Sequence, residues 1–288
     1  MSTATLIDQF QPNLPRGGVC ATGEIITISG EVSSFTYGQN RFTVFDPTSE
    51  TSELYEMTLP FTHQYASPGC PFDGGVAVVA KANSGDAYLL IMYPDGTYDV
   101  YTVGTWPTGD AVGCGPVDLG GDKIAMWARY TGYASRMLDR SGTPTWSNWP
   151  SVKCNVQPQV WGGKVWTSDD SNVYGRSLVD GSVITTLPGT LEGSPSVVKD
   201  GVLWARSSSA AISGVDLTTN VRYLLSIPNE SSEGIAVGAG KLWFANSAAI
   251  YASDGASLET YSHANKGASG SVHFSNGCAW AMHATPTS

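Results

Sequence analysis

Hydrophobic and polar residues alternate along this chain in short stretches that end at glycine-containing turns, and helical spacing is nearly absent. At seven places a glycine is followed three positions later by a large apolar residue. The glycines are Gly23, Gly75, Gly121, Gly163, Gly201, Gly240 and Gly277, and the apolar residues are Ile26, Val78, Ile124, Trp166, Trp204, Trp243 and Trp280. The interval runs from 37 residues (Gly240 to Gly277) to 52 residues (Gly23 to Gly75). Such a period is typical of the four-stranded blades of a β-propeller.

Two further markers repeat with the same period. About twenty residues after most of the glycines, an aspartate occupies a turn motif; the six are Asp46, Asp95, Asp139, Asp180, Asp216 and Asp254. Aspartate suits such hairpin turns because its carboxylate accepts hydrogen bonds from its own turn. Further on, an apolar residue precedes proline in Leu59-Pro60, Trp106-Pro107, Trp149-Pro150, Leu187-Pro188 and Ile227-Pro228. Proline has no N–H for a strand ladder, which favours the exit of an outermost strand.

The fourth unit shows the expected blade most clearly. It predicts strands at residues 157–161, 164–168, 172–178 and 183–187, with a turn at Asp180-Gly181. The sequence therefore predicts an all-β fold, a seven-bladed β-propeller of four-stranded antiparallel blades in one domain spanning residues 1–288. The last unit is short, so we expect residues 3–10 to supply a strand that pairs with it and closes the ring. The stretches SGEVSSFTYGQN and KANSGDA are interpreted as long loops between second and third strands.

The chain of 288 residues carries 15 Lys and Arg against 25 Asp and Glu, a formal net charge of −10. This charge disfavours nucleic acid and anionic membranes as partners, and no apolar run is long enough for a spanning helix. The first residues, MSTATLIDQFQPN, lack the features of a secretory signal, so we expect synthesis in the cytoplasm. The five cysteines (Cys20, Cys70, Cys114, Cys154 and Cys278) fall in different units and are expected to be free, mostly buried thiols.

The stretches GGKVWTSDDSNVYGRSLVDGSVITTLP, GVLWARSSSAAISGVDL and GKLWFANSAAIYASDG resemble repeats of the streptogramin (virginiamycin B) lyase-like superfamily of seven-bladed propellers. The resemblance covers units four to six. It implies a magnesium-assisted elimination that opens a cyclic depsipeptide, with histidine and glutamate on loops of one face. Residues of this chain in such loops are His63, His263, Glu192, Glu230, Glu233, Asp169, Asp170 and His283. The acidic residue that the family carries after its Trp-Phe-Thr strand is absent here, and we expect no catalysis of this type.

Other chemistry finds little support in the sequence. Asp169-Asp170-Ser171-Asn172 has oxygen ligands for a cation but lacks the spacing of a calcium loop, so a solvated loop is the favoured interpretation. The four histidines have no zinc-ligand spacing, and neither a nucleophile elbow nor a phosphate-binding loop occurs. We therefore predict no catalytic residue, no metal site and no cofactor.

The tryptophans that recur three positions after the glycines are predicted to pack between blades. Aromatic residues in irregular contexts are candidates for a binding surface because their faces can stack on sugars or anchor a protein partner. Together with polar loop residues, the candidate binding set is Phe35, Tyr37, Trp106, Tyr130, Tyr133, Asp169, Asp170, Glu230, Glu233 and His263.

The repeated positions are scaffold positions, which argues against a lectin with one sugar pocket in each blade. The sequence favours a non-enzymatic interaction platform whose partners are other proteins of an assembly. In size, acidity and composition it resembles accessory virion proteins of tailed bacteriophages, which implies a place on a tail, baseplate or capsid and contact with host-surface glycans. The alternatives are a lyase-like enzyme and a glycan-binding propeller.

Overall fold

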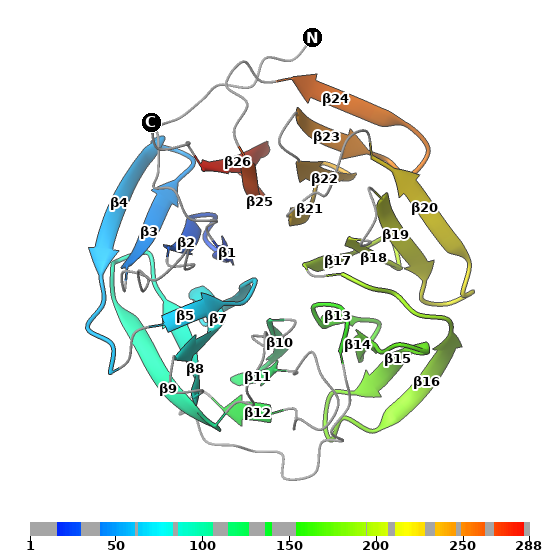
Figure 1. Cartoon of the computed structure of the whole chain (residues 1–288), viewed down its shortest axis with the longest axis horizontal. Helices are drawn as coiled ribbons and strands as arrows, with labels where there is room; N and C mark the ends of the chain where they lie inside the picture. The colour runs from blue at the N-terminus through cyan, green and yellow to red at the C-terminus, as the bar shows by residue number, and fades with distance from the viewer. Residues whose placement is uncertain are drawn as a thin grey trace.

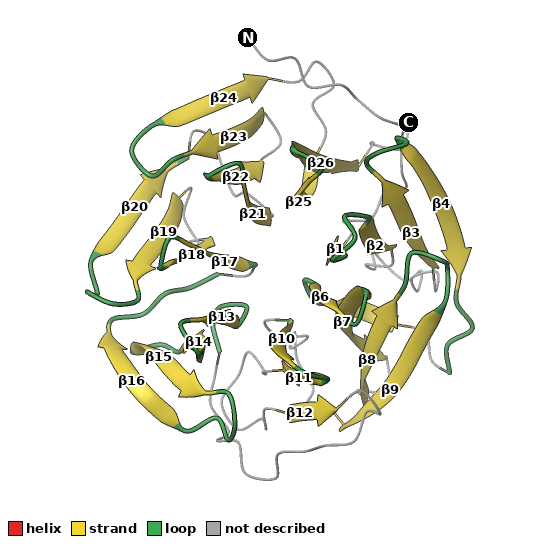
Figure 2. Cartoon of the chain, turned by 180° about the vertical axis from the view of Figure 1, so that it is seen from behind, coloured by secondary structure: helices red, strands yellow, loops and turns green. Residues whose placement is uncertain are grey.

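The structure, a computed structural model, is a β-propeller. The residues that it describes are 16–29, 41–60, 63–82, 86–105, 115–126, 136–139, 154–193, 195–206, 211–227, 234–245, 249–262 and 268–284. These residues form strands and turns without a helix, and the sheets stand around a common centre, with their first strands innermost and their last strands at the rim (Figure 1). Figure 2 shows the same ring from behind. No helix in these ranges is long and apolar enough to cross a membrane.

Five sheets follow the antiparallel path expected for a blade, and in four of them each strand pairs with the next one in sequence. The first contains β1 (Arg16–Val19), β2 (Ile25–Ser29), β3 (Arg41–Asp46) and β4 (Thr51–Glu56). In the second, β5 (His63–Ala66) and β6 (Cys70–Phe72) both pair with β7 (Gly75–Ala82), and β8 (Asp86–Met92) and β9 (Tyr98–Thr105) follow. The other three contain β13 (Gln159–Trp161), β14 (Lys164–Ser168), β15 (Asn172–Ser177) and β16 (Val183–Pro188); β17 (Ser196–Lys199), β18 (Val202–Arg206), β19 (Ala211–Asp216) and β20 (Arg222–Ser226); and β21 (Gly234–Gly238), β22 (Lys241–Ala245), β23 (Ala249–Ser253) and β24 (Leu258–Ser262).

Two smaller sheets complete the described part of the chain. They contain β10 (Pro116–Gly120), β11 (Lys123–Met126) and β12 (Arg136–Asp139), and β25 (Ala268–Ser275) and β26 (Cys278–Ala284). The prediction of antiparallel four-stranded blades in an all-β propeller is thus confirmed. Residues 3–10, the predicted closing strand, lie outside the described residues.

The fourth unit matches its predicted strands to within two residues, and its outermost strand, β16, ends at Pro188 as expected. One loop prediction is wrong. The stretch KANSGDA was expected to form an extended loop between two strands, but β7 continues through Ala82 and β8 begins at Asp86, so the connection is only residues 83–85. The buried strand β7 extends further than the turn-forming residues indicated, and all eight of its residues are buried.

The marker glycines lie in the hairpins between first and second strands. Most of these hairpins have two central residues with positive φ, as in Asp200-Gly201 (51° and 77°), Ala239-Gly240 (47° and 73°) and Asn276-Gly277 (49° and 75°). This is the type I′ geometry that fits strand twist and favours glycine. In the second unit the turn is Asp73-Gly74, and Gly75 already opens β7, so the marker there is one residue late.

The core lies between neighbouring sheets, and the recurring tryptophans contribute to it as predicted. Trp204 packs with Ile235 and Leu242 of the following sheet. The rings of Trp243 and Phe274 are 5.7 Å apart across the next sheet boundary. Each blade thus buries its apolar face against its neighbour, which is how a propeller forms a core without helices.

The last sheet contacts the first. β25 lies against β1, the Ser275 hydroxyl donates to the Gly23 carbonyl, and the rings of Phe45 and Trp280 are 4.9 Å apart in an edge-on arrangement. The two ends of the described chain therefore meet at one seam, which we call the β1–β25 seam.

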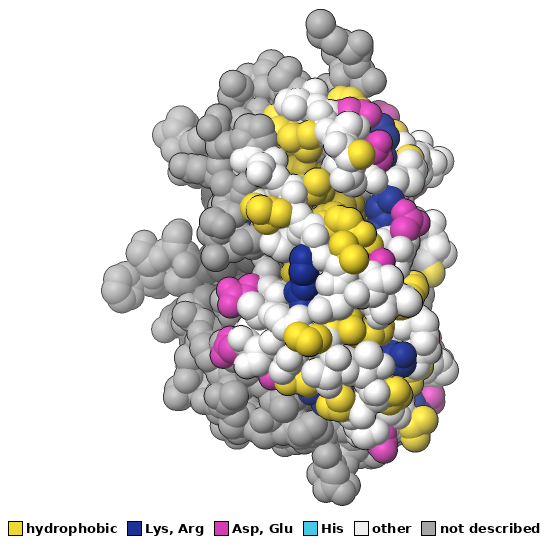
Figure 3. Space-filling model, turned by 90° about the vertical axis from the view of Figure 1, so that its right-hand side faces the viewer, with side chains coloured by type: hydrophobic (Ala, Val, Ile, Leu, Met, Phe, Trp, Pro, Cys, Tyr) yellow, Lys and Arg dark blue, Asp and Glu magenta, His cyan; other side chains and the backbone are white. Residues whose placement is uncertain are grey.

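The rim consists of the outermost strands, and part of it is apolar. Figure 3 views the side of the ring on which β16 and β20 lie and shows hydrophobic side chains exposed between scattered charges. The large apolar side chains that are most exposed include Val179, Ile184 and Leu224, at 78%, 57% and 68%.

Candidate functional site

One face of the ring carries two sets of hairpins, those between first and second strands and those between third and fourth strands. They share a face because successive strands in each blade are antiparallel. We call it the hairpin face. Its turns carry the carboxylates Asp46, Asp73, Asp95, Asp122, Asp180, Asp200, Asp216 and Asp254. The face is therefore rich in turn carboxylates.

The aspartates between third and fourth strands stabilise their own turns, as the sequence predicts. Asp216 Oδ1 accepts the backbone N–H groups of Thr218 (2.8 Å) and Thr219 (2.7 Å). Asp254 Oδ1 accepts those of Ala256 and Ser257, both at 2.8 Å. Hydrogen bonds to the ionised form favour it, so they lower the pKa of Asp254 to about 2 and also depress the pKa of Asp216. These carboxylates are therefore ionised structural groups.

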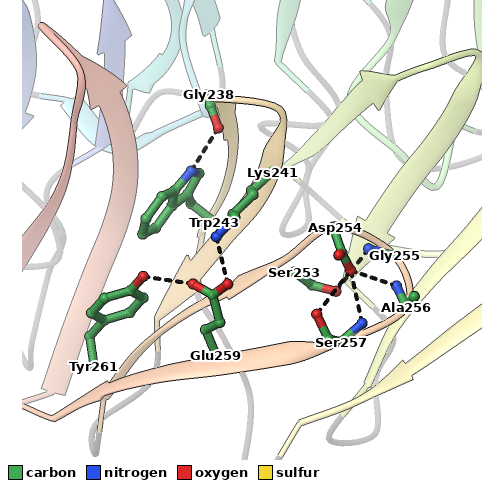
Figure 4. A network of polar contacts seen from close by, with 10 residues as sticks. All are labelled: Gly238, Lys241, Trp243, Ser253, Asp254, Gly255, Ala256, Ser257, Glu259 and Tyr261. Carbon is green, nitrogen blue, oxygen red and sulfur yellow. Dashed lines mark hydrogen bonds and ion pairs between the residues drawn. The ribbon is translucent and has the colours of Figure 1, made fainter. Parts of the chain in front are cut away.

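Figure 4 shows how the last complete blade holds such a turn beside a second polar network. Lys241 Nζ donates to Glu259 Oε1 (2.6 Å), and the Tyr261 hydroxyl donates to Glu259 Oε2 (2.7 Å). The lysine lowers the pKa of the Glu259 carboxyl, and Glu259 raises the pKa of Lys241. The Trp243 indole N–H donates to the Gly238 carbonyl (2.9 Å), a bond that Trp166 and Trp280 also make with the residue five positions earlier. Each polar group here stabilises the scaffold.

Of the loop residues that the lyase resemblance implies, the structure describes Glu192, and it places His63 and His283 in strands β5 and β26 and not in loops. The candidate binding residues that it describes are Asp169 and Asp170, in the connection between β14 and β15. Asp169 Oδ1 accepts the N–H groups of Ser171 and Asn172 (both 2.8 Å), and its Oδ2 accepts the Tyr174 hydroxyl (3.0 Å). Asp170 Oδ1 accepts the side-chain N–H of Asn155 at 3.0 Å. Both carboxylates thus accept hydrogen bonds from protein groups. In the described ranges no three histidine, cysteine or acidic side chains gather as metal ligands.

The remaining candidates lie outside the described residues. They are Phe35, Tyr37, Trp106, Tyr130, Tyr133, Glu230, Glu233 and His263. The proposed binding surface of loop aromatics stays a prediction, as does the role of Asp169 and Asp170 in it.

The described cysteines form no disulfide bond with one another, in agreement with the prediction. Cys20, Cys70 and Cys154 are buried and Cys278 is exposed. Burial raises the pKa of the Cys20 thiol to about 12, so this group is an inert filler at neutral pH. His273 is also buried, its Nε2 has no hydrogen-bond partner, and desolvation lowers its pKa to about 4. His273 is therefore neutral at pH 7.

Sequence reasoning missed two arginines that hold the scaffold. Arg176 is fully buried; its Nε donates to the Thr167 hydroxyl (3.0 Å) and its Nη1 to the Gly181 carbonyl (3.2 Å). Arg222 reaches from β20 to the carbonyls of Gly189 (2.8 Å) and Thr190 (2.9 Å), beyond the end of β16. Arg176 directly follows the glycine in the strand sequence VYGRS, so the sequence carried a signal for its position. Arg222 had no such signal because its partners are backbone atoms of another blade.

Comparison with known proteins supports the fold alone. No family model matches the sequence, and no curated protein matches it. BamB from Moraxella catarrhalis superimposes with a TM-score of 0.58 at 14% identity, over 94% of this chain and 83% of BamB. PorZ, an essential bacterial surface component of the type-IX secretion system of Porphyromonas gingivalis, superimposes with a TM-score of 0.60 at 10% identity, over 97% of this chain but 39% of PorZ. The chain thus has the architecture of these β-propellers.

Proposed function

We propose that this protein is a non-enzymatic interaction platform that binds other proteins of an assembly. The observation that supports this most strongly is that the repeated polar groups are engaged in the scaffold: the turn aspartates, the tryptophan N–H groups and Arg176 all bond within their own blades. A rigid ring of this kind offers broad faces for docking. The similarity to PorZ, a component of a secretion system, is consistent with this class of function.

The finer form of the proposal is a seven-bladed ring. In its support, the innermost strands contact one another in the order β1, β6, β10, β13, β17, β21, β25 and back to β1. Residues 3–10 would then complete the two-stranded last sheet. Deleting residues 1–10 should lower the thermal midpoint strongly if they close the ring, because the edge of β26 loses its partner. An unchanged midpoint would contradict the closure.

The proposed setting is a tailed-phage virion, where the protein would be a tail, baseplate or capsid accessory component made in the cytoplasm. The test is proteomic analysis of purified particles from the genome that encodes this chain. Detection in stoichiometric amounts, retained after a high-salt wash, supports the proposal. Absence from intact particles contradicts it.

The lyase-like and glycan-binding alternatives have their own tests. The resemblance of units four to six to streptogramin lyases favours the first, and turnover of a cyclic depsipeptide in the presence of Mg²⁺ would establish it in place of the platform. The aromatic residues that the sequence predicts in loops favour the second, and sugar-dependent tryptophan fluorescence together with a positive glycan array would establish it.

A further inference from the structure

The outermost strand β16 is an open edge with exposed apolar side chains. Within the described ranges no strand pairs with the side of β16 that faces away from β15. Val183 is 48% exposed and Ile184 57% exposed, and Val179 in the preceding hairpin is 78% exposed. An edge strand of this kind presents unpaired backbone N–H and C=O groups beside apolar side chains, and it is a template for pairing with another strand.

β16 differs in charge from the outermost strands of the other four complete sheets. Its sequence, VITTLP, has no ionisable side chain. The others carry Glu53 and Glu56 on β4, Asp99 on β9, Arg222 on β20 and Glu259 on β24. Charged residues on edge strands oppose pairing between copies. β16 lacks this protection, so pairing it with itself brings no like charges together.

The two ends of β16 carry opposite charges. Asp180, in the exposed hairpin before the strand, is ionised because the Ser177 and Ser182 side chains and the Ser182 N–H lower its pKa by hydrogen bonding. The Arg222 guanidinium lies beyond the other end, bonded to the carbonyls of Gly189 and Thr190. An antiparallel arrangement of two such strands therefore sets the acidic end of each against the basic end of the other. A parallel arrangement would oppose Asp180 to Asp180.

We propose that two copies of this chain pair antiparallel along β16, with Thr185 on the twofold axis. In that register Ile184 lies opposite the partner subunit's Thr186. Asp180 lies opposite the partner subunit's Thr190. Within each subunit the Thr190 carbonyl accepts a hydrogen bond from the Arg222 guanidinium, so this register brings the carboxylate of one copy toward the guanidinium of the other. The interface is isologous, so each favourable contact occurs twice.

The contact is small and the dimer is accordingly weak. A short strand pair with its flanking residues buries less than the roughly 1,200–2,000 Å² of a standard stable interface, so we expect a concentration-dependent equilibrium. This inference does not depend on the proposed virion role.

The first test is sedimentation equilibrium over a concentration series from about 1 μM to about 1 mM, the range in which weak pairs dissociate. The native chain is expected to approach twice its monomer mass. Ile184→Lys should raise the dimer Kd at least about tenfold, because two ammonium groups enter the strand pair. The matched control is Leu224→Lys, an exposed apolar residue on the neighbouring rim strand β20, which should leave the Kd unchanged. A native chain that stays monomeric, or equal effects of both variants, overturns the proposal.

The second test fixes the geometry. Cα atoms of directly opposed residues in antiparallel strands are about 4.5–5.5 Å apart, within the range of a disulfide. On mild oxidation, Thr185→Cys in a Cys278→Ser background should give a covalent dimer whose disulfide joins the two introduced thiols, identified by mass spectrometry, while Leu224→Cys in the same background should not. Equal crosslinking of the two variants would refute the β16 register. Salt should weaken the native dimer, and Asp180→Asn should reduce that salt dependence while keeping the turn.

Discussion

At the scale of single residues, the scaffold depends on small contacts that each recur from blade to blade. A turn aspartate accepts backbone N–H groups, and a tryptophan ring lies over a residue of the adjacent strand. Both follow from local chemistry: an Asp carboxylate reaches its own turn, and a glycine opposite a tryptophan leaves room for the ring. Gly175 lies opposite Trp166 and Gly214 opposite Trp204 in this way.

The turn aspartates should make the protein sensitive to strong acid. Because its folded pKa of about 2 lies below the ordinary 3.8, Asp254 contributes stability that is complete above about pH 4 and is lost as the pH falls toward 2. Asp254→Asn keeps an acceptor for the turn but cannot ionise, so its thermal midpoint should fall less between pH 4 and pH 2 than that of the native protein. Parallel melting curves over this range would contradict the assignment.

Gly214 should not tolerate a side chain. A Cβ there would lie 2.7 Å from Cε3 of Trp204, so Gly214→Ala forces the ring to move and should cost about 1–3 kcal/mol in the free energy of unfolding. Urea denaturation measures the loss. The double variant Gly214→Ala, Trp204→Phe should lose less unfolding free energy than the sum of the losses in the two single variants, because the smaller phenylalanine ring leaves room for the alanine side chain. Strict additivity would show that the two residues do not interact.

At the scale of elements, each blade is a local meander, but neighbouring blades are joined by contacts that no blade contains alone. Arg222 is the clearest case: it extends from β20 to the segment after β16 and bonds to successive carbonyls. Backbone carbonyls at a strand exit need donors, and a guanidinium supplies several in a fixed fork.

Arg222→Ala should loosen the rim between these two blades. Hydrogen bonds to charged groups contribute up to about 3 kcal/mol, but this guanidinium is largely exposed, so we expect a loss of about 1 kcal/mol. Arg222→Lys, which keeps the charge but not the fork, should recover part of it. Hydrogen exchange of the backbone amides of residues 189–191 should rise in the alanine variant. Unchanged protection of these amides would show that Arg222 does not hold the segment after β16 in place.

At the scale of the whole molecule, the β1–β25 seam joins the parts of the described chain that are furthest apart in sequence. It combines polar contacts such as Ser275 to Gly23 with the Phe45–Trp280 ring contact. β25 also holds the buried, unpaired Nε2 of His273. Because the fold opposes protonation of this buried imidazole, acid should destabilise the ring at the β1–β25 seam.

His273 should reduce stability in mildly acidic conditions. Desolvation lowers its pKa from 6.5 to about 4, so the unfolded chain binds a proton over this interval and the folded protein does not. The stability present above pH 6.5 is then lost as the pH falls to about 4, by an amount on the order of 3 kcal/mol. His273→Phe should flatten the dependence of the unfolding free energy on pH in this window, measured by urea denaturation. A variant with the native slope would show that another group titrates.

The repeat in the sequence was sufficient to predict the strands of the fourth unit, the turn aspartates and the inter-blade tryptophans, because these depend on local pattern and on a period. It failed at KANSGDA and at Gly75, where the burial of β7 outweighed the turn signal. It could not locate Arg222, whose partners are backbone atoms of another blade, or the burial of His273. Of the predicted binding residues, Asp169 and Asp170 have protein donors, and this depends on Asn155 and Tyr174, whose proximity a linear motif does not reveal.

The all-β class, the period of the blades and the chemistry of each turn follow from the linear order of residues, since hairpin geometry and strand alternation are set by residues close together in the chain. The folded ring was needed to show which carboxylates accept hydrogen bonds from distant side chains, which arginine joins which blades, and that the edge of β16 is open and uncharged in the described part of the chain. Those features depend on atoms brought together from distant parts of the chain, and burial and hydrogen bonding between them follow from three-dimensional packing.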